Sequence, residues 1–190
     1  MKSAVLIVCV LISVSIISEA CKCFVRHPQN DFCQADYVIK AEVLGEKNVT
    51  SFEKRYKVKV LENYKSGYTS PFKYSQVWIY TTTSSAACGV QLDIGKTYVI
   101  TGPKRGTQLT ANTCSWNVEV SALTSFQRNA LRKGYYRKNC ECKIRECPHN
   151  RCEQGDGCLA PYDNSFCFHQ NAACKQSAYS TSCEWTPNTC

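Results

Sequence analysis

Cysteines place the strongest limit on how this chain can fold, because fourteen of its fifteen lie between Cys21 and Cys190. In a chain that leaves the cell, an even number of cysteines predicts a disulfide framework, here of seven bridges. The spacings Cys-x-Cys and Cys-x4-Cys leave a second interpretation open, a set of structural zinc sites. Three histidines are few for such sites, and an oxidising compartment favours disulfides.

The first twenty residues have the three parts of a secretory signal peptide. Lys2 gives a positive start, residues 4–17 are mostly apolar, and residues 18–20 end with small side chains before Cys21. The apolar run is short for a membrane anchor, which needs roughly 20 apolar residues, and the residues before Cys21 match a bacterial lipoprotein signal poorly. We expect residues 1–20 to be removed and the product, which begins at Cys21, to be secreted to the extracellular space or matrix.

Cysteine density and net charge both change near residue 140. Residues 21–140 hold six cysteines and 18 basic against 8 acidic side chains, a net charge of +10. Residues 141–190 hold eight cysteines and 4 basic against 6 acidic side chains, a net charge of −2. Such a cysteine-rich segment predicts a small, loop-rich module without a large apolar core. We therefore expect a first domain at residues 21–140 and a C-terminal subdomain at residues 141–190.

The first domain has the pattern of a small β-barrel. Apolar and polar residues alternate, or β-branched and aromatic residues gather, at residues 37–42, 55–60, 77–80, 98–101 and, more weakly, 108–111. Turns are predicted at Gly45, Gly67, Gly95, Gly102 and residues 103–106. Five short strands with a helix beside them predict a closed barrel.

The helix is predicted near residue 126. Its apolar side chains fall on one face, it can begin at Ser121 or Thr124 as a cap, and it can end at Gly134. That face consists of Leu123, Phe126, Ala130 and Leu131.

The mature N-terminus has the chemistry of a metal chelator. If Cys21 and Cys23 are both bridged to the domain, Lys22 projects outward and the terminal α-amine is held rigidly. An α-amine is partly neutral near physiological pH, so its nitrogen and the carbonyl oxygen of Cys21 could chelate a zinc ion that has an open position. The alternative is that both cysteines are only structural, and their spacing does not decide between the two.

Three stretches of the sequence closely resemble the tissue inhibitors of metalloproteinases. They are CKCFVRHPQNDFCQADYVIKAEVLG at the mature start, SSAACGVQLDIGKTYVITG in the middle and CECKIRECPHNRC at the junction. The likeness continues through Ser182, Cys183, Glu184 and Trp185. This resemblance implies a mainly β fold, with a five-stranded OB-type (netrin-like) Greek-key barrel, flanking helices and a small disulfide-rich C-terminal subdomain.

The resemblance also implies a function and its residues. Cys21 would bind the catalytic zinc of a target protease through its amine and carbonyl, and Lys22 would enter the neighbouring specificity pocket. The remaining contacts would come from Cys23, Phe24 and Val25, and from a second strand formed by Ser84, Ser85, Ala86, Ala87 and Cys88. The expected partners are secreted or cell-surface zinc metalloproteinases, either matrix metalloproteinases or related metzincins. We expect a monomer without a cofactor of its own.

The resemblance further implies the pairing of the cysteines. The expected pairs are Cys21 with Cys88, Cys23 with Cys114, Cys33 with Cys140, Cys142 with Cys183, Cys147 with Cys152, and Cys158 with Cys174. Cys167 and Cys190 have no counterpart in the usual six-bridge pattern, and we expect them to pair with each other.

The chain departs from the family at positions that affect selectivity. Inhibitors of matrix metalloproteinases usually carry Thr or Ser at the position of Lys22 and proline at that of Val25. Burying an ammonium group in an apolar pocket is unfavourable, although a lysine stem can lie in such a channel with its charge in solvent. The hairpin at residues 45–54 is also short, so the contacts that longer versions make with membrane-bound targets are expected to be missing.

The sequence contains no catalytic motif of its own, so we expect a protein that is not an enzyme. His27, His149 and His169 lie far apart in sequence and are expected to be surface or loop histidines. The remaining alternative is a non-inhibitory netrin-like module that binds matrix or signals.

A basic stripe consists of Arg55, Lys57 and Lys59, which share one face of a predicted strand. It is either a solvated edge strand protected by lysines or a site for sulfated glycosaminoglycans. Nucleic acid is not expected as a partner, because the protein leaves the cell. Asn48 begins an Asn-x-Thr sequon in a predicted turn and is a candidate for glycosylation.

Overall fold

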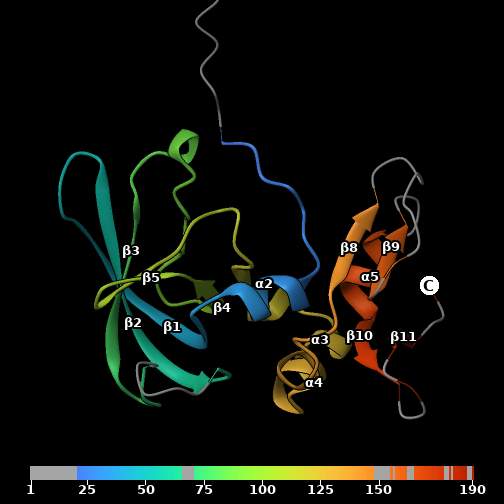
Figure 1. The fold of residues 1–190 in the computed structure, drawn as a ribbon. Coiled ribbons are helices and arrows are strands. Elements are labelled where there is room, and N and C mark those ends of the chain that lie inside the picture. Colours follow the sequence, from blue (N-terminus) through green and yellow to red (C-terminus); the bar gives the residue numbers. More distant parts are fainter. Residues whose placement is uncertain are drawn as a thin grey trace, which may run out of the picture.

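The computed structural model describes residues 21–65, 71–147, 155, 157–161, 165–177, 180, 182–187 and 190. The expected signal peptide, the turn predicted at Gly67, His149 and Cys152 lie outside the described residues. No helix in the described part of the chain is both long and apolar enough to cross a membrane. The fold is mainly β, as predicted, with a barrel at one end of the molecule and the cysteine-rich C-terminal part at the other (Figure 1).

One sheet forms the barrel. Its strands are β1 (Tyr37–Asn48), β2 (Glu53–Asn63), β3 (Gln76–Thr82), β4 (Thr97–Gly102), β5 (Lys104–Arg105), β6 (Gln108–Thr110) and β7 (Val118–Glu119). They are ordered β5-β6-β3-β2-β1-β4-β7, and only β3 and β6 pair in parallel. Pro103 alone separates β4 from β5, so the chain itself links the two sides of the sheet. The five predicted strands are therefore confirmed as β1, β2, β3, β4 and β6.

Alternation along the strands produces the barrel core. In β2, Tyr56, Val58 and Val60 are fully buried, whereas Arg55, Lys57 and Lys59, which alternate with them, face outward. Each such apolar side chain contributes about 1.5–3 kcal/mol when it is buried. The core also contains Tyr37, Ile39, Ala41, Val43, Ile79, Val90, Leu92, Tyr98, Ile100, Leu109 and Ala111.

The predicted position of the turn in the first hairpin is wrong. Gly45 does not form a turn but lies within β1, beside a register shift that lets the strand bend. The turn occupies residues 49–52, where the hydroxyl of Thr50 accepts hydrogen bonds from the main-chain N–H groups of Phe52 and Glu53 at 3.2 and 3.0 Å. The two strands consequently extend further than the sequence predicted.

The predictions of the other turns are confirmed only in part. Gly95 lies in a turn with a positive φ of 84°. Gly102 is the last residue of β4, and residues 103–106 include strand β5 before the chain turns at Gly106.

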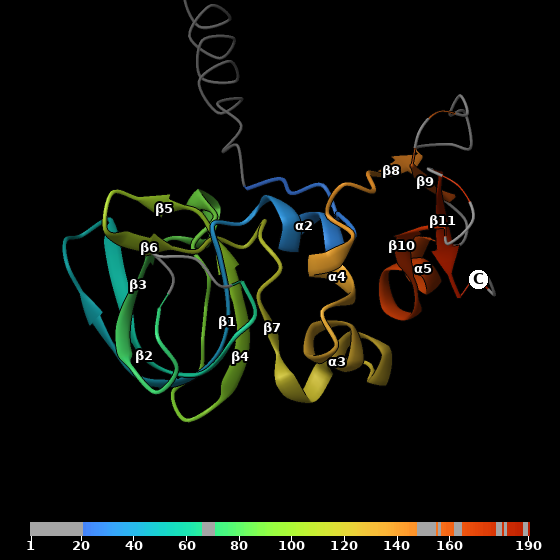
Figure 2. The same ribbon diagram turned by 60° about the horizontal axis from the view of Figure 1, so that its bottom comes forward.

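Three helices pack between the barrel and the C-terminal part (Figure 2). They are α2 (Pro28–Gln34), α3 (Ser125–Arg132) and α4 (Tyr135–Lys138). The predicted helix is confirmed as α3, and its cap is Thr124: the Thr124 hydroxyl accepts from the Gln127 N–H at 3.1 Å, and the Gln127 side chain accepts from the Thr124 N–H at 3.0 Å. The resemblance implied flanking helices, but the positions of α2 and α4 were not predicted.

The C-terminal module, residues 141–190, is stabilised mainly by disulfide bonds. It contains β8 (Ile144–Cys147), β9 (Cys158–Pro161), α5 (Ser165–Asn171), β10 (Ala173–Gln176) and β11 (Cys183–Thr186). Its small core consists of Cys142, Ile144, Cys158, Ala160 and Cys174. Ala173 instead packs in the cluster beneath α3 and α4, so the module and the first domain are in contact. The division at residues 139–141 remains a proposal.

Candidate functional site

The N-terminal segment, residues 21–25, is an extended and exposed piece of chain. In Figure 1 it runs from the top of the barrel toward β8 and then turns down into α2. Lys22 is exposed, and Phe24 and Val25 have 94% and 76% of their surface open to solvent. Large apolar side chains this exposed beside one another are typical of a surface that binds another molecule.

Two disulfides fasten the start of this segment. Cys21 is bonded to Cys88, and Cys23 is bonded to Cys114. The bridges lie side by side, with the Cys21 sulfur 3.6 Å from the sulfurs of both Cys23 and Cys114. The main-chain nitrogen of Cys21 also donates a hydrogen bond to the carbonyl of Ala86 at 3.0 Å. The first residue of the described chain is therefore held at its backbone as well as at its side chain.

The edge loop, residues 84–88, lies next to Cys21 but is not the strand that was predicted. Residues Ser85–Ala87 form the 3-10 helix η1, and Cys88 follows it in a left-handed conformation with φ 61°. The Thr82 hydroxyl donates to the carbonyls of Ser84 and Ala87 at 3.2 and 3.0 Å. These bonds fold the chain back on itself directly after β3, which a continuing strand could not do.

The tip of the first hairpin is a neighbour of the edge loop that the sequence analysis missed. The N–H of Thr83 donates to the carbonyl of Phe52 at 3.1 Å, and the hydroxyl of Thr83 donates to the carbonyl of Ser51 at 2.9 Å. The Phe52 side chain is 80% exposed. Its only signal in the sequence is an aromatic residue in a polar turn.

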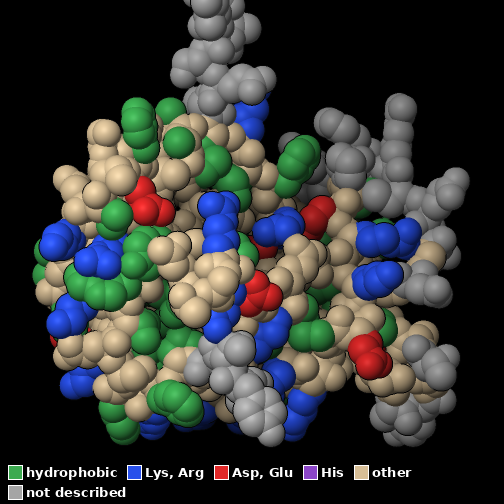
Figure 3. Space-filling model, turned by 60° about the vertical axis from the view of Figure 1, so that its left-hand side comes forward, with side chains coloured by type: hydrophobic (Ala, Val, Ile, Leu, Met, Phe, Trp, Pro, Cys, Tyr) green, Lys and Arg blue, Asp and Glu red, His purple; other side chains and the backbone are tan. Residues whose placement is uncertain are grey.

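The basic stripe lies in the middle of the sheet, so its interpretation as a protected edge strand is wrong. Strand β2 has β1 on one side and β3 on the other. The residues opposite the stripe on β3 are Tyr80, Trp78 and Gln76, and the Arg55 guanidinium stacks 4.1 Å from the Trp78 ring centroid. Figure 3, which brings this side of the barrel forward, shows Lys and Arg side chains around hydrophobic ones.

Comparison of the sequence with known proteins identifies its family. A family model described as "Tissue inhibitor of metalloproteinase" matches residues 19–190. Metalloproteinase inhibitor 3 of Gallus gallus is 36% identical over 141 residues, which cover 72% of this chain and 65% of the relative. Metalloproteinase inhibitor 2 of Homo sapiens is 36% identical over 156 residues, which cover 75% and 68%. This chain thus spans about two thirds of the length of these relatives.

The chain belongs to the tissue inhibitor of metalloproteinase family. Because this is a family of inhibitors, membership identifies the protein as a non-enzyme. In this member, six of the expected cysteine pairs are present as disulfides. Besides Cys21–Cys88 and Cys23–Cys114, they are Cys33–Cys140, Cys142–Cys183, Cys158–Cys174 and Cys167–Cys190. The expected Cys147–Cys152 pair falls outside the described residues.

Clusters of sulfur in this family member are not zinc sites. The sulfurs of Cys21, Cys23, Cys88 and Cys114 lie within 4.8 Å of one another, as do those of Cys142, Cys174 and Cys183. All seven cysteines are oxidised in disulfides, and a metal ligand must be a thiolate. The structural-zinc alternative is therefore wrong for these residues.

His27 and His169 do not match the prediction of surface or loop residues, and His149 lies outside the described residues. His27 is completely buried, and its ring lies 5.4 Å from the ring of His169, although the two are far apart in sequence. Burial is the main cause that lowers the pKa of His27 to about 4, and the nearby His169 lowers it further. Nothing in the local sequence indicates this pair, because the two histidines meet where the N-cap residue of α2 contacts α5.

Arg26 links the N-terminal segment to helix α2. Its guanidinium lies 2.7 Å from the carboxylate of Asp31 and donates to the side-chain carbonyl of Gln34 at 2.6 Å. A longer hydrogen bond of 3.5 Å reaches the carbonyl of Cys114. Burial raises the pKa of Asp31 to about 6, although the charge of Arg26 opposes this rise.

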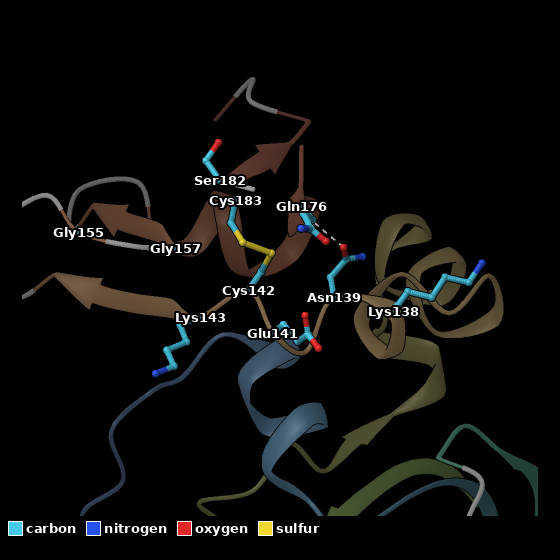
Figure 4. Close-up of a pocket in the computed structure, with 10 residues that line it drawn as sticks. All are labelled: Lys138, Asn139, Glu141, Cys142, Lys143, Gly155, Gly157, Gln176, Ser182 and Cys183. Atoms are coloured by element: carbon cyan, nitrogen blue, oxygen red, sulfur yellow. Dashed lines mark hydrogen bonds between the residues drawn. A yellow bond between two sulfur atoms is a disulfide. The ribbon is translucent and has the colours of Figure 1, made fainter. Parts of the chain in front are cut away.

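A cavity of about 630 Å³ lies at the base of the C-terminal module (Figure 4). Figure 4 shows the Cys142–Cys183 disulfide between its walls and the hydrogen bond of 3.2 Å from the N–H of Gln176 to the side chain of Asn139. None of its lining residues belongs to the N-terminal segment or to the edge loop. It is therefore separate from the candidate site.

Proposed function

We propose that this chain inhibits zinc metalloproteinases by presenting the amine and carbonyl oxygen of a processed Cys21 to the catalytic zinc of the target. The observation that carries this proposal is the double hold on Cys21, by the bridge to Cys88 and by the hydrogen bond of its nitrogen to Ala86 at 3.0 Å. Family membership supports inhibition as the activity.

The chemistry follows from the hydrogen bond to Ala86. After removal of residues 1–20, the nitrogen of Cys21 is a primary amine, which can donate one hydrogen to the Ala86 carbonyl and still offer a lone pair to zinc. With the carbonyl oxygen of Cys21 it forms a five-membered chelate. A catalytic zinc held by three protein ligands keeps its fourth position for water, and the chelate would replace that water. Because the amine is already fixed, little conformational freedom is lost on binding.

The surfaces around Cys21 supply the remaining contacts in this proposal. Lys22 enters the pocket beside the zinc, Cys23, Phe24 and Val25 lie along the cleft, and the edge loop forms the second line of contact. The tip at Phe52 extends this surface, since it is hydrogen-bonded to Thr83 immediately before the edge loop. We further propose that the mature chain is a secreted monomer and that Asn48, which is exposed at the end of β1, is glycosylated.

The proposal is tested by sequencing the N-terminus of the secreted product and assaying the same material on a panel of metalloproteinases. We expect a product that begins at Cys21 and inhibits at least one member of the panel. A blocked or extended terminus together with full inhibition would contradict the chelation mechanism. A free Cys21 without inhibition would favour the alternative, a non-inhibitory netrin-like module.

Substitution of Lys22 is expected to change selectivity. Lys22→Thr should strengthen inhibition of proteases with closed apolar pockets by roughly tenfold, about 1.4 kcal/mol, because no ammonium group is buried. Lys22→Gly should weaken inhibition of every target, because pocket contacts are lost and the segment gains conformational freedom. Inhibition constants of both variants on one closed-pocket and one open-pocket protease provide the test. Equal constants for parent and variants on both enzymes would show that Lys22 is outside the pocket.

A second candidate function, binding of sulfated glycosaminoglycans, is favoured by the position of the basic stripe. Edge protection does not explain cations on an interior strand, and their partners on β3 are not acidic. Aromatic rings beside cations also suit the sugar and sulfate groups of such a chain. Because surface charges are screened beyond about 8 Å at physiological ionic strength, this binding should weaken steeply with salt.

Replacing Arg55, Lys57 and Lys59 together by Ser is expected to lower the salt concentration at which the protein leaves a heparin column. The matched control replaces Lys133, Arg137 and Lys138 by Ser, which removes the same charge from exposed positions on and beside α4. The stripe variant should elute earlier than the control. If the two variants elute together, net charge rather than the stripe determines retention.

A further inference from the structure

The N-terminal segment continues directly into a contact with the C-terminal module. The main-chain N–H of His27, two residues after the segment, donates to one carboxylate oxygen of Glu146 at 2.7 Å. Glu146 lies on β8, and its other oxygen is 3.0 Å from Nε2 of His169 on α5. One carboxylate therefore binds the main chain of the first domain and a side chain of the C-terminal module. Hydrogen bonds to charged groups are stronger than those between neutral groups.

The side chain of His27 makes this contact stereochemically specific. Its Nδ1 accepts a hydrogen bond from the Gln29 N–H at 3.1 Å, and its Nε2 lies 3.0 Å from the carbonyl of Phe168. A carbonyl can only accept, so Nε2 carries the hydrogen and the ring is neutral. The ring of Trp185 lies 5.3 Å away. With both nitrogens used and no exposed surface, the imidazole has one orientation.

The segment is consequently fixed at both of its ends. The Cys23–Cys114 bridge holds one side, and Glu146 holds the main chain at His27 on the other. Only residues 24–26 lie between these two points, and Arg26 is itself bound to Asp31. The two exposed apolar side chains, Phe24 and Val25, thus project from a span that has little freedom to move.

We infer that Glu146 is a positioning residue for the N-terminal segment. By holding the main chain at His27, this residue of the C-terminal module determines the direction in which Phe24 and Val25 approach a target. This inference rests on the proposed inhibition. It assigns to the C-terminal module a part in shaping the inhibitory surface, through one carboxylate.

The contact is expected to loosen in acid. The charged or titratable groups around His27 are Arg26 and Asp31 beside it, Glu146 on β8, His169 on α5 and Tyr136 on α4. Burial acts to raise the pKa of Glu146. The hydrogen bonds from His169 and the His27 N–H, together with the charge interaction with His169, outweigh burial and lower the pKa, so the carboxylate stays ionised. A proton on His27 would occupy Nδ1 and break the bond from Gln29.

The contributions of His27 and Asp31 to stability change with pH in opposite directions. The pKa of His27 falls from 6.5 to about 4 on folding, so its contribution to stability is lost as the pH falls through that window. The pKa of Asp31 rises from 3.8 to about 6, so its contribution has the opposite sign and is lost as the pH rises to about 6. The two largely cancel in the free energy of unfolding, and the loosening should be local to the segment.

The test compares Glu146→Ala and Glu146→Gln in the full mature protein with a control, Glu141→Ala, which removes an exposed carboxylate of the same module. At pH 7.5, Glu146→Ala should raise the inhibition constant about tenfold and speed hydrogen exchange of the His27 amide at least tenfold. Glu146→Gln should stay within about twofold of the parent, because its amide oxygen can still accept from His27. The control should match the parent in both measurements.

A titration followed by NMR gives a readout that packing alone would not move. In the parent, the ring signals of His27 and the amide signals of residues 22–25 should shift together with a midpoint near pH 4. Unchanged segment signals through this titration, or an unchanged inhibition constant in Glu146→Ala, would overturn the inference. A parent that inhibits no protease overturns the proposed function instead, and the exchange rate of the His27 amide then decides whether Glu146 holds the segment.

Discussion

Acetylation of the Cys21 α-amine, or one additional alanine before Cys21, is expected to reduce inhibition at least a thousandfold, about 4 kcal/mol. Acetylation turns the amine into an amide, whose nitrogen has no lone pair to give to zinc. The extra alanine moves the free amine to a residue that no bridge holds, and it places chain where the catalytic zinc would have to lie. Inhibition constants on a protease that the parent inhibits are the measurement.

Both changes should leave the fold intact, which separates loss of chelation from loss of structure. The bridges of Cys21 and Cys23 are unchanged, and the hydrogen bond to Ala86 needs only one N–H. The free energy of unfolding is therefore expected to stay within about 0.5 kcal/mol of the parent value. Undiminished inhibition by the alanine-extended protein would rule out the mechanism, whatever its stability.

The second large effect is expected from a single methyl group at Gly89, which follows the edge loop. A Cβ there would overlap the carbonyl oxygen of Thr82 and lie 2.9 Å from that of Ser84. Because both obstacles are backbone atoms, Gly89→Ala must displace the loop that holds Cys88, and through it Cys21. Forced displacements of this kind cost about 1–3 kcal/mol of stability. Inhibition should fall at least a hundredfold, because the displaced loop carries Ala86, the hydrogen-bond acceptor of the Cys21 nitrogen.

Gly45→Ala is the matched control for this substitution. A Cβ on Gly45 meets no atom within 4 Å, so the same chemical change should leave both stability and inhibition close to those of the parent. Thermal unfolding and inhibition constants of the two variants, measured side by side, give the comparison. Equal inhibition by the two variants would show that the position of the edge loop does not matter.

The barrel could be predicted from the sequence because its signals are local. Tyr56, Val58 and Val60 alternate with basic residues, and this period places one face in the core whatever surrounds the strand. Helix α3 was predictable for a similar reason, since Thr124 and Gln127 form its cap within four residues of each other. The pattern in each case lies within a few consecutive residues.

Helix α2 and the burial of His27 could not be predicted, because both depend on distant chain. The buried face of α2 includes Gln29 and Asp31, polar residues that give no apolar period. In the described part of the chain, the Gln29 side chain bonds to the carbonyls of Asn139 and Cys174 and to the N–H of Cys174, at 2.8–3.0 Å. A side chain whose partners lie more than 100 residues away has no local signature.

The backbone conformation of the edge loop could not be predicted for a different reason. The resemblance indicated which residues lie beside Cys21, and they do, but a short 3-10 helix replaced the expected strand. The reason is the pair of hydrogen bonds from the Thr82 hydroxyl to Ser84 and Ala87, which turn the chain after β3. The resemblance therefore predicted that these residues lie near Cys21, but it did not predict their local backbone conformation.

The connectivity of the three bridges in the first domain determines the order in which a cell can complete this protein. Cys21, Cys23 and Cys33 are the first three cysteines of the described chain to leave the ribosome, yet their partners lie 67, 91 and 107 residues later. Until those partners emerge, the closely spaced thiols of Cys21 and Cys23 are open to exchange with any oxidant or disulfide nearby. Cys21 can be fastened only after Cys88 has emerged, and Cys23 only after Cys114, so the N-terminal segment stays open while most of the first domain is being made.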